Sequence, residues 1–379
     1  MTERGAERNE AIDWLRGVVM IVMALDHARM FLGTPVDLTT APTALYFTRW
    51  ITHYCAPVFV LLAGMAAWLH GRRLGSTAAL AGYLVTRGLW LVLLEVTVVR
   101  FVWTFALGPS TLFLQVIWAI GAAMVGLAAL VWLPRGAIAV VAVVLVAGHN
   151  LLDVVHADAL GSLRWLWLLL HEPGPLAPFD GARWFVAYPL LPWLGVMASG
   201  YAMGAWAQEP RDVRRRRFLA LGLALTAGFV VLRALNLYGD PQPWVLRESP
   251  LRTVLGFLDC EKYPPSLLFV AMTIGPALCL LAWMDRPLGP SARPVVVFGR
   301  VPLFYYVLHL LLLHLMAVVV AWPGDGAAAL SRSFGNQPLG LPLPAVYACW
   351  GGALVLLYPA CRWFAGVKRR STSPLMSYL

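Results

Sequence analysis

The chain has 379 residues, of which 60% are hydrophobic and 13% are charged, and its formal net charge is +10. A soluble protein of this length cannot bury so much apolar surface, whereas a polytopic membrane protein exposes it to lipid. The composition therefore excludes an ordinary soluble globular protein. It predicts an all-α polytopic membrane protein, because hydrocarbon offers no partner for the backbone groups of an open segment.

Ten hydrophobic segments follow one another along the chain, each near the ~20 residues that a helix needs to cross a bilayer. They lie at residues 12–33, 47–69, 82–104, 112–133, 136–155, 185–206, 218–237, 265–284, 301–321 and 343–362. No soluble stretch separates them, so we expect about ten transmembrane helices in a single domain over residues 1–379. No cleavable signal peptide is apparent, and we expect the first helix to be retained.

Arginine placement predicts the orientation of these helices. Most of the 29 Lys and Arg residues fall before the first helix, after the last one and in every second loop, including Arg4, Arg8 and the run from Arg214 to Arg217. The positive-inside rule then places both termini in the cytoplasm. The net positive charge thus indicates topology and contact with anionic lipid, and not nucleic-acid binding.

Two loops on the outer side are long enough to contribute to a site. Residues 156–184 contain a short apolar run that we expect to lie along the membrane interface. Residues 238–264 end in DCEKYPPSL, where Pro264 and Pro265 should begin the next helix and hold Lys262 and Ser266 at its outer mouth. The five cysteines form no C-x-x-C pair, so we expect neither a disulfide framework nor a zinc site.

Ionisable side chains inside the predicted helices are the strongest sign of function, because hydrocarbon makes them costly. His27, His53, His149 and His314 all lie about 9–10 Å from the outer ends of their helices at 1.5 Å per residue, and His309 lies deeper. Asp26 and Arg29 share one face of the first helix, and Arg49 and His53 share one face of the second. The short connection between these helices predicts that His27 and His53 approach each other across a cavity. Arg100 and Arg233, nearer the surface, are expected to be snorkelling anchors.

These residue types supply the parts of a group-transfer site. Histidine can act as a general base or nucleophile, a carboxylate can orient an imidazolium, and arginine can neutralise an oxyanion or bind phosphate. Each group also has a simpler interpretation, as part of hydrogen-bonded contacts between helices.

Several segments resemble the heparan-α-glucosaminide N-acetyltransferase-like family of bacterial membrane proteins, within the transmembrane acyltransferases. The resemblance rests on AIDWLRGVVMIVMALDHARMFLG with TRWITHYCAPVFVLLAG, and on YPLLPWLGVMASGYAMG, KYPPSLLFVAMTIGP and FGRVPLFYYVLH. It implies transfer of an acetyl or other acyl group from cytoplasmic acyl-CoA to an amine or hydroxyl of a glycan or lipid at the outer face. No metal is expected.

The resemblance also has one departure. The lysosomal member of the family has its catalytic histidine in the outer segment after the first helix, whereas residues 34–46 here contain no histidine. The role would move to His27 or His53. We therefore predict a catalytic group of His27, Asp26, His53 and Arg49. The CoA donor is assigned to Arg16, Arg293, Arg300 and His309, and the acceptor to Arg29, Lys262, Ser266 and Glu95.

Two other functions stay open. A proton-coupled transporter or flippase would use the same ionisable layer as a pathway, although no internal repeat is visible. A non-catalytic membrane module would fit the missing loop histidine. For all three we expect a multi-pass protein of the bacterial inner membrane. Its partners would be the lipid bilayer and a glycan or lipid acceptor, with no nucleic acid and with a homodimer as an option.

Overall fold

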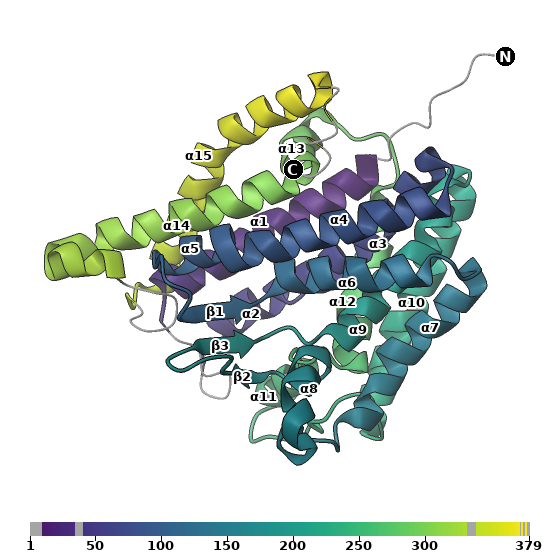
Figure 1. Ribbon diagram of the computed structural model, residues 1–379, viewed down its shortest axis with the longest axis horizontal. Helices are drawn as coiled ribbons and strands as arrows, with labels where there is room; N and C mark the ends of the chain where they lie inside the picture. Colours follow the sequence, from purple (N-terminus) through teal and green to yellow (C-terminus); the bar gives the residue numbers. More distant parts are fainter. Residues whose placement is uncertain (1–9, 35–40, 332–338, 372, 374–375, 377–379) are drawn as a thin grey trace. The chain divides into compact units, whose positions relative to one another are not determined.

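The computed structural model describes residues 10–34, 41–331, 339–371, 373 and 376. Arg4, Arg8 and part of the 34–46 segment lie outside the described residues. Helices make up most of the described chain, as the composition predicts (Figure 1). The chain divides into two compact units. One contains Ala56–Glu95 and Leu112–Arg286, and the other contains Ile12–Cys55, Val96–Thr111 and Pro287–Leu379.

The first unit is a group of apolar helices packed in pairs: α4 (Thr77–Leu94) against α6 (Val116–Leu130), α7 (Arg135–Gly148) against α9 (Leu190–Met203), and α10 (Arg211–Leu235) against α12 (Leu267–Met284) (Figure 1). Glycines allow these helices to approach closely, as is common in membrane proteins. A Cβ on Gly88 of α4 would meet the carbonyl oxygen of Gly121 of α6 at 2.5 Å. The same holds for Gly200 of α9, whose Cβ would lie 2.0 Å from the carbonyl oxygen of Leu61 in α3 (Cys55–Leu74).

The long loops of this unit are folded. The 156–184 segment forms the 3-10 helix η3 (Ala157–Leu163), α8 (Arg164–Leu170) and a hairpin of β2 (Gly174–Leu176) and β3 (Arg183–Val186). Strand β1 (Thr111–Leu114) joins it in the order β1-β3-β2. An all-α fold with a helix starting at residue 112 is therefore wrong in this detail. The second loop contains α11 (Pro250–Leu258), which Pro250 begins and the Ser249 hydroxyl caps.

The second unit contains α1 (Glu10–Leu32), α2 (Thr43–Thr52), α5 (Arg100–Thr104), α13 (Arg293–Arg300), α14 (Pro302–Asp325) and α15 (Leu343–Arg370). Helix α14 packs against α15 and α5 (Figure 1). Helix α1 contacts α13 through two glycines, because a Cβ on Gly17 would meet Val295 O at 1.9 Å and one on Gly299 would meet Asp13 O at 1.8 Å.

The expected continuous helix over residues 47–69 is interrupted. Helix α2 ends at Thr52, with His53 as its C-cap, and α3 begins at Cys55. The cause lies in Pro57, which has no N–H to donate and whose ring clashes with the carbonyl group four residues earlier, that of His53. A second irregularity, a π-helical segment at Glu95–Val99, separates α4 from α5 in the expected 82–104 helix.

Six helical segments in the described part of the chain are long and apolar enough to cross a membrane. They are Thr43–Leu74, Arg135–Leu152, Arg211–Leu235, Leu267–Met284, Pro302–Leu330 and Leu343–Arg370. These segments fit a multi-pass membrane protein. The count of about ten, the cytoplasmic termini and the single domain stay predictions.

Candidate active site

A pair of histidines forms the centre of the site in the second unit. The Nδ1 atom of His27 on α1 lies 2.7 Å from Nε2 of His309 on α14, and the two rings stack with their centroids 5.0 Å apart. Both side chains are buried, His309 completely. The sequence predicts His309 to lie deeper in the membrane than His27, and this depth stays a prediction.

The hydrogen bonds of the pair assign its protons. Nδ1 of His309 lies 2.9 Å from the carbonyl oxygen of Tyr305, which can only accept, so Nδ1 carries a hydrogen. In the neutral ring Nε2 of His309 is then the acceptor, and Nδ1 of His27 donates to it. The lone pair of His27 consequently falls on Nε2, the atom able to act as base or nucleophile.

Aromatic rings surround this pair. Trp103 of α5 meets His27 edge-on at 5.2 Å, Tyr306 meets it edge-on at 6.2 Å, and Tyr305 stacks on His309 at 5.0 Å. Such apolar walls exclude water and strengthen the electrostatic interactions between the rings.

Asp26 and Arg29 lie on the same helix beside the pair. Arg29 Nη2 donates to Asp26 Oδ1 at 2.9 Å, as the i, i+3 spacing predicts. Arg29 is thus one partner of the Asp26 carboxylate, and His309 is one partner of the His27 ring. A direct role of Asp26 in orienting His27 stays a prediction.

His53 and Arg49 lie where α2 ends. His53 is buried at the interruption before α3, and Arg49, one turn earlier, is half-buried, with its carbonyl oxygen accepting a hydrogen bond of 2.7 Å from Thr52 Oγ1. The approach of His53 to His27 across a cavity stays a prediction.

A cationic group lies at the beginning of α1, where α13 contacts it. Arg16 Nη1 donates to Asp13 Oδ1 and to the carbonyl oxygen of Gly299, both at 3.1 Å. Arg300 Nε lies 3.6 Å from the other oxygen of the same carboxylate. Arg293 is exposed at the first residue of α13. The structure thus joins Arg16 and Arg300 through Asp13, a residue that the sequence analysis did not single out.

The predicted acceptor residues of the first unit have structural partners. The carboxylate of Glu95 accepts a hydrogen bond of 3.1 Å from the backbone N–H of Trp118, in the first turn of α6, and so caps that helix. Ser266 is fully buried, caps α12 and donates to Asp240 Oδ2 at 2.7 Å. Lys262 is half-buried, with Nζ 5.1 Å from the ring centre of Tyr263. Their contact with an acceptor stays a prediction.

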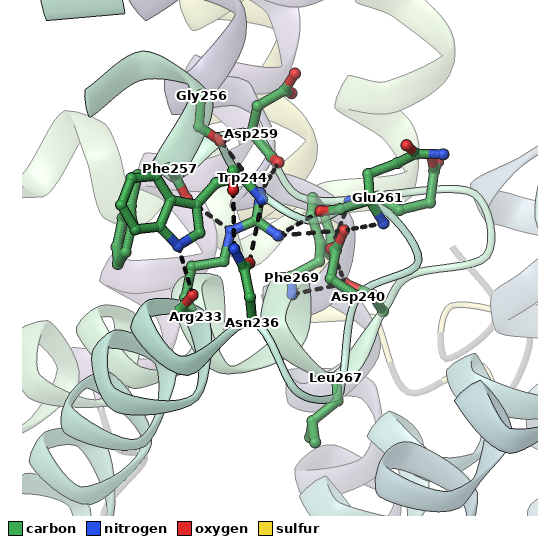
Figure 2. Close-up of polar contacts among 12 residues, drawn as sticks. Arg233, Asn236, Asp240, Trp244, Gly256, Phe257, Asp259, Glu261, Leu267 and Phe269 are labelled. Atoms are coloured by element: carbon green, nitrogen blue, oxygen red, sulfur yellow. Dashed lines mark hydrogen bonds and ion pairs between the residues drawn. The ribbon is translucent and has the colours of Figure 1, made fainter. Parts of the chain in front are cut away.

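Arg233 organises the 238–264 loop (Figure 2). Its side chain is 2% exposed, so the expected snorkelling anchor is wrong. The guanidinium donates to the backbone carbonyl oxygens of Phe257, Gln242, Gly256 and Asp259 at 2.7–3.1 Å and lies 3.4 Å from Asp240 Oδ1. Asp240 also accepts from the backbone N–H of Glu261, which links the loop to the start of α12.

His314 is not part of the His27–His309 pair, and it contacts a backbone carbonyl group and an aromatic ring. Its Nδ1 donates to the carbonyl oxygen of Val102 at 2.6 Å, and its ring stacks on Phe105 with centroids 3.7 Å apart. Sequence reasoning missed both the His27–His309 contact and the aromatic ring of Trp103, because partners 282 residues apart leave no local pattern.

Comparison with known proteins agrees with the resemblance of the helical segments. No curated protein sequence matches this chain significantly. A family model described as heparan-alpha-glucosaminide N-acetyltransferase, catalytic, matches residues 8–238, which include α1 with His27 but end before His309. The match covers more than half of the chain, and the chain therefore belongs to the heparan-alpha-glucosaminide N-acetyltransferase catalytic family, a family of membrane acetyltransferase type.

Proposed function

We propose that this protein is a membrane-embedded acyltransferase that moves an acetyl or other acyl group from cytoplasmic acyl-CoA to an amine or hydroxyl acceptor, a glycan or lipid, at the outer face. The observation that supports this most is the ordered hydrogen bonding from the Tyr305 carbonyl through His309 to His27. It leaves Nε2 of His27 with a lone pair and provides an acceptor for the proton that remains on Nδ1. A carboxylate has the same orienting role in hydrolase triads.

His27 has two chemical routes available. In direct transfer, Nε2 removes the proton of the acceptor N–H or O–H while that atom forms a bond to the thioester carbon. The C–S bond then breaks, and His27 returns the proton to the thiolate. In the two-step route, Nε2 itself bonds to the carbonyl carbon, and the C–S bond breaks so that thiolate leaves. The acceptor N–H or O–H then attacks the acyl-imidazolium, the bond from the acyl carbon to Nε2 breaks, and the acceptor proton goes to the thiolate. Both routes develop positive charge on His27, which the acceptor Nε2 of His309 stabilises.

The positive charges of the arginines on α1 and α13 suit the negatively charged phosphates of the acyl-CoA donor. Arg16, Arg300 and Arg293 carry three positive charges against the single charge of Asp13, and guanidinium groups bind phosphate with paired hydrogen bonds. Arg16 and His27 are 11 residues apart on one continuous helix, about 17 Å at the helical rise. An extended thioester arm spans such a distance, so phosphates held near Arg16 would allow the acyl group to reach His27. We further propose Arg49 as the oxyanion partner.

The test is transfer from radiolabelled acetyl-CoA by purified full-length protein, with a panel of amino sugars, glycans and lipids as acceptors. We expect His27→Ala to reduce transfer by at least about 100-fold, the size of a general base contribution. His70→Ala, a half-buried histidine of α3, serves as the matched control and should transfer normally. Wild-type protein that neither binds CoA nor transfers the label to any acceptor would refute the proposal, and so would full activity of folded His27→Ala.

The same preparation separates the two routes. Rapid denaturation near neutral pH without acceptor should leave label on the protein if an acyl-histidine forms, and hydroxylamine should remove it. Unlabelled protein with normal transfer indicates the direct route.

A further inference from the structure

Three potential metal ligands meet in the first unit, outside the histidine pair. His149 begins the 3-10 helix η2 (His149–Leu152) that continues α7, and Asp153 follows that helix as its C-cap. His171 ends α8, 22 residues later in the chain. His149 and Asp153 lie at the two ends of this short 3-10 helix, and α8 brings the second imidazole to them.

The distances suit a shared ion. One ligand atom from each residue lies within 4.8 Å of the other two, and His171 Nε2 lies 3.0 Å from Asp153 Oδ1. Ligand bonds of 2.0–2.1 Å in a tetrahedron require ligand atoms roughly 3.3 Å apart, so a small side-chain shift closes the site. The two imidazole rings lie 5.7 Å apart and at 66° to each other, an arrangement in which both can point toward one centre.

Three ring nitrogens of His149 and His171 are buried without a hydrogen bond of normal geometry, and a metal ion would give them a partner. His149 and His171 are each 2% exposed. Neither ring nitrogen of His149 makes a hydrogen bond of normal geometry, although the Pro265 carbonyl lies near enough to interact with the ring, and Nδ1 of His171 makes none either. Buried polar atoms without such bonds are uncommon, because leaving water without a replacement partner costs free energy.

A second layer of contacts holds the ligands in place. Asn150 Nδ2 donates to Asp153 Oδ2 at 2.9 Å, and its Oδ1 accepts from the backbone N–H of Leu267 at 3.0 Å. Trp167 packs against His171 with ring centroids 5.1 Å apart, and its Nε1 donates to the Val155 carbonyl at 2.9 Å. Supporting contacts of this kind fix the orientation of ligands in metal sites.

From this geometry we propose that His149, Asp153 and His171 bind one divalent transition-metal ion, of which zinc is the first candidate. Two imidazoles and one carboxylate are a ligand set for zinc with an open fourth position, and the same set also serves ferrous iron. The Asp153 side chain is 24% exposed, which leaves that position accessible to water or a small ligand. The bound ion would join the end of α7 to the end of α8. This inference is independent of the acyltransferase proposal and departs from the expectation that no metal is needed.

The experiment uses full-length protein purified in detergent with an affinity tag that contains no histidine. After removal of metal by a chelator, zinc, cobalt, magnesium and, without oxygen, ferrous iron are added separately. Bound metal is measured by mass spectrometry, and affinity by competition with a chromophoric chelator. We expect one equivalent of zinc or cobalt per chain and no retained magnesium. Tighter retention of iron would support the site and assign it to iron.

Variants test the ligands. His149→Ala and His171→Ala should each weaken zinc binding by roughly 100-fold or more, and Asn150→Ala by about 10-fold, as supporting contacts do. His156→Ala, an exposed histidine of the same segment, is the matched control and should bind as the wild type does. Binding unchanged in His149→Ala and His171→Ala would overturn the proposal.

A wild-type measurement covers the case in which these variants do not fold. Cobalt bound to nitrogen and oxygen ligands in a tetrahedral site gives intense visible absorption. Wild-type protein that lacks this spectrum and retains less than half an equivalent of any of the transition metals refutes the site.

Discussion

Replacing Arg233 with methionine should destabilise the 238–264 loop of the first unit. The substitution keeps most of the apolar stem and removes a guanidinium that four backbone carbonyl groups and Asp240 surround. Each hydrogen bond to a charged donor contributes about 1.5–3 kcal/mol, but the sum would overshoot because the freed carbonyls regain water. Removing one partner of a buried ion pair costs about 3–5 kcal/mol, and we expect Arg233→Met to lower the free energy of unfolding by this amount.

The assay combines two measurements in detergent. Unfolding by an increasing fraction of a denaturing detergent gives the loss of stability, and limited proteolysis of residues 236–266 reports whether the loop itself has opened. Arg247→Met is the control, since Arg247 is an exposed arginine of the same loop, where a substitution should change stability by less than about 0.5 kcal/mol. If Arg233→Met matches Arg247→Met in both measurements, the guanidinium does not hold the loop, and the argument from its contacts fails.

Three further predictions concern the pair, the loop and the packing. His309→Phe should reduce kcat by about 100-fold, because it removes the acceptor of the His27 proton and keeps a ring; an unchanged kcat in steady-state kinetics would contradict the relay. Burial, aided by the charge of Asp240, raises the pKa of Glu261 above its ordinary 4.5, so its stabilising effect is full below that pH and disappears as pH rises through the higher folded value. Glu261→Gln should therefore gain thermal stability relative to wild type between pH 4 and pH 7, and a constant difference would refute the assignment. Gly200→Ala should destabilise by about 1–3 kcal/mol, since its Cβ meets backbone and not a movable side chain, whereas Gly82→Ala, with open space around it, should be neutral in the same unfolding assay.

The helices were largely predictable because the hydrophobic run that forms each one is visible in the local sequence. The expected 265–284 helix is α12 (Leu267–Met284), which the pair Pro264 and Pro265 precedes and Ser266 caps. Hydrophobicity alone did not reveal the interruption at His53. Pro57 indicates it, because a proline cannot donate a hydrogen bond to the carbonyl group four residues earlier. Strand β1 was missed since a four-residue apolar run next to a helix has no distinct period.

The candidate site was predictable in its residue types and not in its partnerships. His27 and Asp26 lie within a hydrophobic segment, and this identified α1 as part of a candidate site. Ionisable groups in such segments are costly and are therefore usually functional. Which side chain faces His27 depends on how α14 packs, and that information is distributed over the whole interface. The His149, Asp153 and His171 group shows the same difficulty. The cysteine spacings indicate no metal site, and the second histidine comes from a folded loop that was expected to lie on the membrane surface.

The distance along the chain between His27 and His309 has a consequence for synthesis. The ribosome adds His27 282 residues before it adds His309, an interval of roughly 15 to 55 s at ordinary elongation rates. During that time the His27 imidazole and the neighbouring ion pair of Asp26 and Arg29 lack the ring that later accepts the His27 proton. A ribosome that stalls after α10 leaves a product that includes the whole family match but has an unfinished histidine pair. Quality control of such fragments would then act on a chain in which His27 lacks the His309 ring.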